Sequence, residues 1–197
     1  LMMPVYEFFD LTNSLSYSRI LLRDSLNKRY RNGIDRRRPD YPSFLNFLQK
    51  EINKLAPQKK IFIGTSAGGS AAIRVGHDLG ADYVHAFGAK TGVNPNDLQN
   101  TKREPDLELG PILNESNLKT RYYLHYCLGH EADAWHAVKV ATAPGVVTLG
   151  YPGTTHVVAV PLAKKGLLAK LLLIENQEHI VGLAREFYDN QVIVTGN

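Results

Sequence analysis

The segment Gly64-Thr65-Ser66-Ala67-Gly68-Gly69 places a serine between closely spaced glycines. The apolar residues Ile61 to Ile63 before it predict a short buried strand, and the small residues after it predict a helix lying close to the sheet. A Gly-x-Ser-x-Gly sequence at such a junction is typical of a sharp, strained turn that lifts the serine hydroxyl above the sheet. We expect glycine at positions 64 and 68 because side chains there would collide where strand and helix cross. The pattern predicts that Ser66 is a nucleophile, and a glycine-rich turn that only packs is the alternative.

A serine nucleophile needs a general base, and the base needs an acid that orients it. His156 lies in a loop that follows a predicted strand and is the expected base. Asp133 follows an earlier predicted strand and is the expected acid, with Glu131 as its rival. His130, in the same loop as Asp133, is the alternative base. The other interpretation makes His156 a surface residue at a helix start and Asp133 a helix N-cap.

The elements that must position these residues alternate between strands and helices. Short strands that are apolar on both faces are predicted at 20–22, 61–63, 83–87, 122–128 and 146–149. Helices are predicted at 43–55, 66–79, 134–141, 157–173 and 175–188, a polar loop with little regular structure at 94–118, and a short apolar tail at 192–194. This alternation predicts an α/β fold, a three-layer α/β/α sandwich with a mostly parallel sheet of about five or six strands. Functional loops follow the carboxyl ends of such strands, so Ser66, Asp133 and His156 would meet at one edge.

The order Ser66, Asp133, His156 resembles that of the α/β-hydrolase superfamily. The similarity extends from about Tyr6 to about Leu173. Its matching residues are Leu21-Leu22-Arg23-Asp24, Gly64 to Gly69 with Ala71-Ala72, Gly80-Ala81-Asp82, Asp133 with His136-Ala137, and Tyr151-Pro152-Gly153 leading to His156. Within the superfamily the chain is most similar to small bacterial hydrolase-like proteins associated with surface polysaccharide modification. The resemblance implies a small or N-terminally shortened α/β-hydrolase fold.

The resemblance also implies a mechanism. Ser66 Oγ would attack an acyl carbonyl, His156 would take its proton, and Asp133 would hold the imidazole tautomer. The backbone N–H of Ala67 would supply one donor of the oxyanion hole. The family's second donor follows a strand that precedes Leu21, and no such strand is evident, so we expect an incomplete oxyanion hole unless an N–H from 3–5 replaces it. The implied protein is a serine esterase or thioesterase that forms an acyl-enzyme on an ester of a small molecule or glycan.

Two further residues border the expected site. Lys90 and Thr91 follow the predicted strand 83–87, and we expect them to contact the substrate, although a lone lysine is more often only solvated. The excursion 94–118 has the length of a short cap over the site. Two other functions remain open at this point. One is an acyltransferase using the same three residues, and the other is a non-catalytic binding or scaffold protein on a hydrolase fold.

Composition limits these choices further. The chain has 197 residues, 44% of them hydrophobic and 21% charged, which predicts one ordered domain spanning 1–197. The longest apolar stretches are far short of the ~18 residues that a membrane span needs. The one cysteine, Cys127, forms neither an internal disulfide nor a zinc site by itself. No basic segment followed by an apolar one opens the chain, so a cytoplasmic location is expected.

The net charge of +4 is unevenly distributed. Between Arg19 and Arg38, eight basic residues stand against two aspartates, a local charge of +6. An anionic partner is one interpretation, but a solvated surface with ion pairs is favoured, and no nucleic acid is expected. The chain has no Gly-x-x-x-x-Gly-Lys sequence for a nucleotide. Apart from the region 130–136, its histidines lack the spacing of metal ligands, so no cofactor and no metal are expected.

Overall fold

The computed structural model describes residues 8–13, 15–26, 28–94, 108–115, 119–173 and 176–196. The chain divides into two compact units, Leu1–Gln58 and Lys59–Asn197. The expectation that 1–197 forms one domain stays a prediction.

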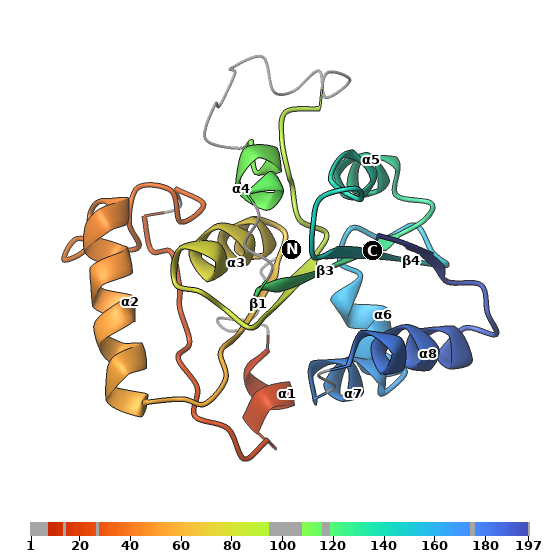
Figure 1. The fold of residues 1–197 in the computed structure, drawn as a ribbon, viewed down its shortest axis with the longest axis horizontal. Helices are drawn as coiled ribbons and strands as arrows, with labels where there is room; N and C mark the ends of the chain where they lie inside the picture. The colour runs from red at the N-terminus through yellow and green to blue at the C-terminus, as the bar shows by residue number, and fades with distance from the viewer. Residues whose placement is uncertain are drawn as a thin grey trace. The chain divides into compact units, whose positions relative to one another are not determined.

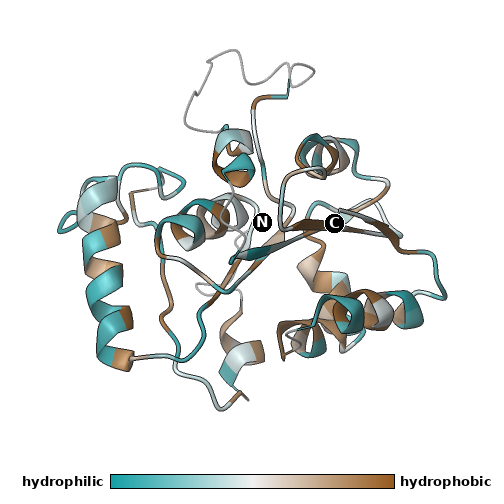
Figure 2. Cartoon of the chain, viewed as in Figure 1, coloured by the Kyte–Doolittle hydropathy of each residue, from teal (hydrophilic) through white to brown (hydrophobic). Residues whose placement is uncertain are grey.

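Within the first unit, the described residues form two helices, α1 (Phe9–Asn13) and α2 (Tyr41–Leu55). α2 starts after Asp40, whose carboxylate accepts the N–H of Ser43 at 2.7 Å and so caps the helix. Phe44, Leu48 and Ile52 are buried at a spacing of four residues and form the apolar face of α2. Figure 2 shows hydrophilic and hydrophobic residues alternating along this helix. The predicted helix over 43–55 is confirmed, and it begins two residues earlier.

The predicted strand over 20–22 is wrong. These residues have no regular secondary structure, and 36% of Leu21 is exposed. Three apolar residues form a strand only when a neighbouring strand pairs with them, and the described residues of this unit contain no sheet. Instead, the carboxylate of Asp24 accepts the N–H groups of Leu26 and Tyr30, both at 3.0 Å, and organises an irregular turn.

Part of the basic segment is neutralised within this unit. The carboxylate of Asp35 pairs with the guanidinium of Arg38, and this contact lowers the pKa of Asp35. The same carboxylate accepts the backbone N–H of Arg37 at 2.9 Å and that of Arg38 at 2.8 Å. The guanidinium of Arg38 also lies 4.1 Å from the ring centre of Phe47 in α2. Arg38 is therefore an ion-paired residue of the fold, as the solvated-surface interpretation expects, whereas an anionic partner for the segment stays a prediction.

The second unit is built on a five-stranded sheet (Figure 1). Its strands are β1 (Ile61–Thr65), β2 (Tyr83–Phe87), β3 (Arg121–Cys127), β4 (Val146–Tyr151) and β5 (Ile193–Thr195), and they lie in that order across the sheet. β1 to β4 are parallel, and β5 pairs antiparallel with β4. The predicted α/β fold with a mostly parallel sheet is confirmed. Residues 193 and 194 of the expected apolar tail 192–194 belong to the fifth strand.

Helices cover both faces of this sheet. α3 (Ala67–Asp78), α4 (Gly110–Asn114) and α5 (Glu131–Lys139) connect the parallel strands and lie on one face in Figure 1, whereas α6 (Ala159–Lys164), α7 (Leu167–Leu173) and α8 (Gln177–Phe187) lie on the other. Right-handed crossovers between successive neighbouring strands place their helices on the same side. The predicted helix over 157–173 is two helices because Gly166 has φ +69°, a left-handed conformation that favours glycine. α4 lies inside the predicted loop 94–118.

The core of this unit is packed between α3 and the sheet. Ala72 and Ile73 of α3 belong to one buried cluster with Val84, Tyr122 and Val146 of three adjacent strands. Figure 2 shows hydrophobic residues concentrated in the strands and in α7, with hydrophilic residues along α8. β4 is buried along its whole length. Because the central strands are buried and closely packed, the sheet fixes the positions from which the loops at its carboxyl edge start.

A chain of buried polar side chains crosses the middle of the sheet. His85 Nδ1 lies 3.1 Å from His125 Nε2, and His125 Nδ1 lies 2.9 Å from the hydroxyl of Tyr151. Each of the three residues is at most 1% exposed. Burial lowers the pKa of His85 to about 3 and that of His125 well below 6.5, so both imidazoles are neutral. In the tautomers that fit, Tyr151 donates to His125, and His125 donates to His85.

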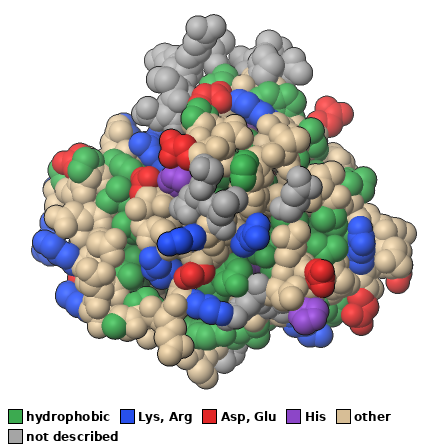
Figure 3. Space-filling model, in the orientation of Figure 1, with side chains coloured by type: hydrophobic (Ala, Val, Ile, Leu, Met, Phe, Trp, Pro, Cys, Tyr) green, Lys and Arg blue, Asp and Glu red, His purple; other side chains and the backbone are tan. Residues whose placement is uncertain are grey.

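Within the part of the chain that the structure describes, no helix has the length and hydrophobicity that crossing a membrane requires. The face of the molecule seen in Figure 3 carries basic, acidic and apolar side chains interspersed with one another. The expected cytoplasmic location stays a prediction.

Candidate active site

The loops that carry the candidate residues start from one edge of the sheet. Because β1 to β4 are parallel, Ser66 after β1, Gly88 after β2, Asp133 after β3 and His156 after β4 all follow carboxyl ends. Neighbouring strands are about 4.8 Å apart, so β1 and β4 are separated by about 14 Å. The five residues after Tyr151 can extend over about 16 Å. The carbonyl of His156 lies over Gly88 at the end of β2, so the loop 152–156 crosses two strand spacings, about 10 Å, and the His156 side chain covers the remaining distance to Ser66.

Ser66 occupies the strained turn that its sequence predicts. Its φ of 53° and ψ of −116° lie in a region that residues other than glycine rarely adopt. A Cβ at Gly64 would collide with the carbonyl of Gly68, which confirms the need for glycine at position 64. The same expectation for Gly68 is wrong, because a Cβ there would have no heavy atom of the described residues within 4 Å. The close approach involves Gly69, whose added Cβ would lie 3.1 Å from the carbonyl oxygen of Gly64.

Ala67 is the first residue of α3. The first N–H groups of a helix have no partner within it, and the helix dipole makes this end favourable for negative charge. The oxyanion role expected of Ala67 fits this position and stays a prediction. Residues 3–5, the expected alternative source of a second donor, lie outside the described residues.

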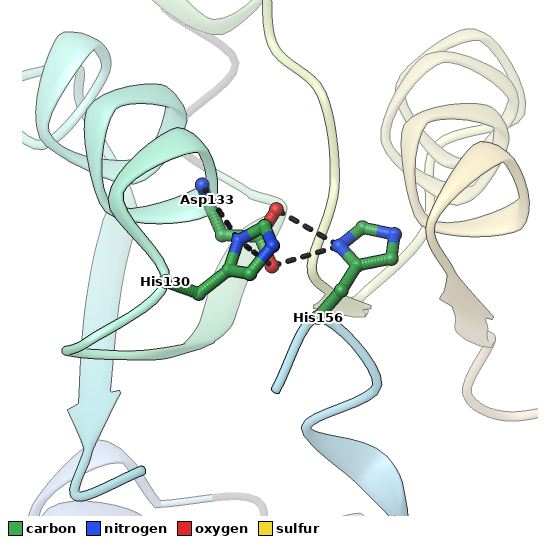
Figure 4. Close-up of side chains that lie close together, drawn as sticks. All are labelled: His130, Asp133 and His156. Carbon is green, nitrogen blue, oxygen red and sulfur yellow. Dashed lines mark hydrogen bonds and ion pairs between the residues drawn. The ribbon is translucent and has the colours of Figure 1, made fainter. Parts of the chain in front are cut away.

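His156 joins Ser66 to Asp133 through its two ring nitrogens. His156 Nε2 lies 2.9 Å from Ser66 Oγ, and His156 Nδ1 lies 2.9 Å and 3.0 Å from the two carboxylate oxygens of Asp133. Figure 4 shows Nδ1 facing Asp133 and the other ring nitrogen turned away from it. A neutral imidazole that donates Nδ1–H to the carboxylate has a lone pair on Nε2, which can accept the serine proton. The structure therefore brings together the three residues that the sequence selects.

The environment of Asp133 explains why it, and not Glu131, reaches His156. Both acids lie in the first turn of α5, where the helix dipole stabilises negative charge. Asp133 is 3% exposed and contacts the histidine, whereas Glu131 is exposed to solvent. The N-cap role that was the alternative interpretation of Asp133 belongs to another residue, because His130 caps α5 and its Nδ1 accepts the N–H of Asp133 at 3.3 Å.

His130 also contacts the carboxylate of Asp133. Its Nδ1 is 3.2 Å from Asp133 Oδ2, and its ring centre is 5.3 Å from that of His156 (Figure 4). In this arrangement the histidine that contacts the serine hydroxyl is His156. His130 is a second imidazole on the same carboxylate, an arrangement that the sequence does not predict.

Gly88 is a site residue that sequence reasoning missed. Its φ is +56°, and an added Cβ would lie 2.7 Å from the carbonyl oxygen of His156 and 3.1 Å from Asp133 Oδ2. The loop 152–156 crosses the end of β2 at this point, so only a residue without a side chain fits beneath it. A related contact lies over β3, where the N–H of Gly129 donates to the carbonyl of Gly153 at 2.8 Å. A glycine directly after a buried strand was the available signal.

Lys90 and Thr91, the two residues expected to contact substrate, lie in surroundings that differ from each other. Thr91 is 0% exposed and donates its hydroxyl to the carbonyl of His136 at 2.6 Å. In this structure its side chain fastens the loop after β2 to α5 instead of facing a substrate. The backbone of Lys90 exchanges hydrogen bonds with the hydroxyl of Ser70, at 3.1 Å and 2.8 Å. Contact of the Lys90 side chain with substrate stays a prediction.

An ion pair and a hydrogen bond fix the backbone on both sides of residues 95–107. The carboxylate of Glu108 pairs with Lys139 of α5 at 2.6 Å and accepts the N–H of Val93 at 3.0 Å. The hydrogen bond from Lys139 lowers the pKa of Glu108. Residues on either side of 95–107 are thereby tied together beside α5. The expected cap itself falls within 95–107, outside the described residues.

The same neighbourhood contains potential metal ligands. A ring nitrogen of His130, a carboxylate oxygen of Asp133 and a ring nitrogen of His156 all lie within 4.8 Å of one another. His136, the other histidine of the region 130–136, is 2% exposed, and its Nδ1 lies 3.2 Å from the N–H of Thr91.

Comparison of the sequence with known protein families found no family that matches, and comparison with characterised proteins found no similar sequence. The fold and the geometry of the site therefore carry the functional argument. They define an α/β protein with a mostly parallel sheet and a line of serine, histidine and aspartate at its carboxyl edge.

Proposed function

We propose that this protein is a serine hydrolase that cleaves esters or thioesters, of a small molecule or a glycan, through an acyl-enzyme. One observation carries the proposal. His156 Nε2 lies 2.9 Å from Ser66 Oγ while His156 Nδ1 contacts both oxygens of Asp133. A nucleophile, a base and an orienting acid within hydrogen-bond reach are what covalent acyl transfer requires.

In the proposed reaction, Ser66 Oγ attacks the acyl carbonyl as its proton passes to His156 Nε2. Asp133 stabilises the resulting imidazolium through Nδ1–H, and its burial keeps this interaction out of water. The N–H of Ala67 donates to the oxyanion of the tetrahedral intermediate. The imidazolium then protonates the leaving alcohol or thiol. Water attacks the acyl-enzyme with His156 as base again, and the proton returns to Ser66.

The backbone at Ser66 favours catalysis over mere packing. A non-glycine residue at φ 53° costs about 1–3 kcal/mol, and such strain collects at functional sites. A serine that only packed in this turn would be replaced by glycine without that cost. The strain is explained when the hydroxyl must stand at a fixed point in front of His156.

The relationship to α/β-hydrolases is part of the same proposal. The order Ser66, Asp133, His156 along the chain supports it, as does the placement of each residue after a parallel strand. Helices on both faces of the sheet also fit this class (Figure 1). The nucleophile turn between β1 and α3, with its tight glycine at position 64, is the most specific of these features.

The test is labelling of the purified protein with a fluorophosphonate probe, which reacts with activated serines whatever their natural substrate. Wild type should label, and Ser66→Ala should not. His156→Ala and Asp133→Asn each remove one of the two groups that polarise the serine. Each variant should label about 10⁴-fold more slowly than wild type. Ser70→Ala is the matched control, because Ser70 lies in α3 one turn beyond Ser66, and its hydroxyl bonds only backbone groups, those of Lys90 and the carbonyl of Ser66, in the contacts that the structure gives it.

Folded wild-type protein that does not label would contradict the proposal. Rapid labelling of His156→Ala combined with its loss in His130→Ala would keep the hydrolase but replace the base. Acyl-enzyme partitioning separates hydrolysis from acyl transfer, since p-nitrophenyl acetate with a sugar alcohol present gives acetate in the first case and a sugar ester in the second.

A further inference from the structure

We propose that His130, Asp133 and His156 form a Zn²⁺ site that switches off the catalytic serine. The inhibitory part of this inference rests on the proposed function, whereas the metal site itself does not. The three side chains converge in Figure 4, with Asp133 Oδ2 2.9 Å from His156 Nδ1 and 3.2 Å from His130 Nδ1. The three candidate ligand atoms all lie within 4.8 Å of one another.

These separations suit a zinc ion. Zn–N and Zn–O bonds are about 2.0–2.2 Å, so the ligand atoms of a tetrahedral site lie about 3.3 Å apart. The two contacts to Asp133 are already close to that value. The distance between the two imidazole nitrogens must shorten when zinc binds. Rotation of the His130 side chain, which is 30% exposed, can shorten it.

The type of the donor atoms selects the metal. Two imidazoles and one carboxylate favour Zn²⁺ and similar transition metals over Mg²⁺ and Ca²⁺, which prefer oxygen ligands. The side chains of His130 and His156 are 30% and 35% exposed, so an ion can enter and a water can fill its fourth position. Asp133 is 3% exposed and fixed in the first turn of α5, which orients its carboxylate before any metal binds.

Zinc at this position removes the base. In the catalytic tautomer, His156 carries its proton on Nδ1 and presents a lone pair on Nε2 to Ser66. Zn²⁺ binds the lone pair of a deprotonated Nδ1, so a neutral zinc-bound imidazole carries its single proton on Nε2. That N–H can only donate to Ser66 Oγ and cannot accept its proton. The metal also takes the carboxylate that would stabilise the imidazolium.

The experiment uses chelator-treated protein and two readouts. Isothermal titration with ZnCl₂ measures binding without reference to activity, and the rate of fluorophosphonate labelling measures the state of Ser66. His130→Asn removes one imidazole but keeps a residue that caps α5 well. His179→Asn, at an exposed position in α8, is the matched control.

We expect one zinc ion per wild-type chain, labelling slowed at least 100-fold at saturation, and no comparable binding of Mg²⁺. In His130→Asn, zinc should bind at least tenfold more weakly, and its labelling should resist zinc at concentrations that silence wild type and His179→Asn. Equal zinc affinity in His130→Asn and wild type would overturn the site. Zinc that binds but leaves labelling unchanged or accelerates it would overturn the inhibition. Zinc binding that depends on His130 in a protein that never labels would leave the metal site standing and refute the proposed function.

Discussion

The buried pair His85 and His125 should make the second unit sensitive to mild acid. Both imidazoles are 1% exposed, and burial lowers the pKa of His85 to about 3 and that of His125 well below its usual value. In the unfolded chain both return to about 6.5, so between pH 6.5 and the folded pKa the unfolded state binds more protons. The stability that depends on neutral imidazoles is therefore present above pH 6.5 and is lost as the pH falls.

The size of the effect follows from linkage. Each histidine lowers the free energy of unfolding by about 1.4 kcal/mol per pH unit, which is about 2 kcal/mol between pH 7 and pH 5. The pair together removes about 4 kcal/mol, a large part of the 5–15 kcal/mol that stabilises a typical domain. The carboxyl group of Glu108 contributes little in this window, because its pKa is lowered from an ordinary value of 4.5.

Urea unfolding followed by tryptophan fluorescence measures this loss in the right unit, since the single tryptophan, Trp135, lies in α5. His85→Phe preserves a flat ring against Tyr123, whose ring centre is 5.0 Å away, and removes one titrating group. The variant is less stable at both pH values because His125 loses its hydrogen-bond partner. Its loss of stability between pH 7 and pH 5 should nevertheless be about 2 kcal/mol smaller than that of wild type.

Comparing the two pH values within each variant cancels the packing cost of the substitution. His179→Gln, at an exposed position in α8, should retain the wild-type loss. An identical loss in His85→Phe and wild type would refute the reasoning. So would an NMR titration in which the His85 ring protonates near pH 6.5 in the folded protein.

Gly88→Ala should slow fluorophosphonate labelling about 100-fold, because its Cβ would lie 2.7 Å from the His156 carbonyl at a φ of +56°, whereas Gly68→Ala, with no described heavy atom within 4 Å, should label normally. Equal labelling of the two would contradict the crossing of the loop over β2. Thr65→Val should raise the free energy of unfolding in urea by about 1 kcal/mol, since the buried Thr65 hydroxyl has no partner among the described residues. A loss of stability would mean that this hydroxyl is bonded. Cys127→Ser should label at the wild-type rate, because burial raises the pKa of the Cys127 thiol and keeps it unreactive.

The sequence predicts the elements whose signal is local. β2 has its predicted bounds, and β1, β3 and β4 start or end within two residues of them, because each is a short apolar run between polar turns. The failures depend on partners distant in sequence. The run 20–22 looks as apolar as β1, yet it has no strand to pair with among the described residues of its unit. β5 has three residues, and only its pairing with β4 makes it a strand.

The residues of the site also differ in whether local sequence predicts them. Ser66, Asp133 and His156 can be chosen from the sequence because each follows a strand, and parallel strands end at one edge. The same rule places His130 at this edge, but it does not predict the contact of His130 with Asp133. This contact comes from the first turn of α5, where capping the helix puts an imidazole 3.2 Å from the same carboxylate that orients the base.

The loop 152–156 decides whether these residues form a site at all. It carries the backbone of His156 from the end of β4 across β3 to the end of β2, about 10 Å, and the side chain reaches Ser66 from there. The loop passes directly over the intervening strand ends, which is why Gly88 follows β2 and Gly129 lies two residues beyond β3. The glycines are therefore required by the path of the loop over β3 and β2. Inserting a single glycine into 152–156 should slow labelling of Ser66 by relaxing the position of His156, while the distant sheet core remains folded.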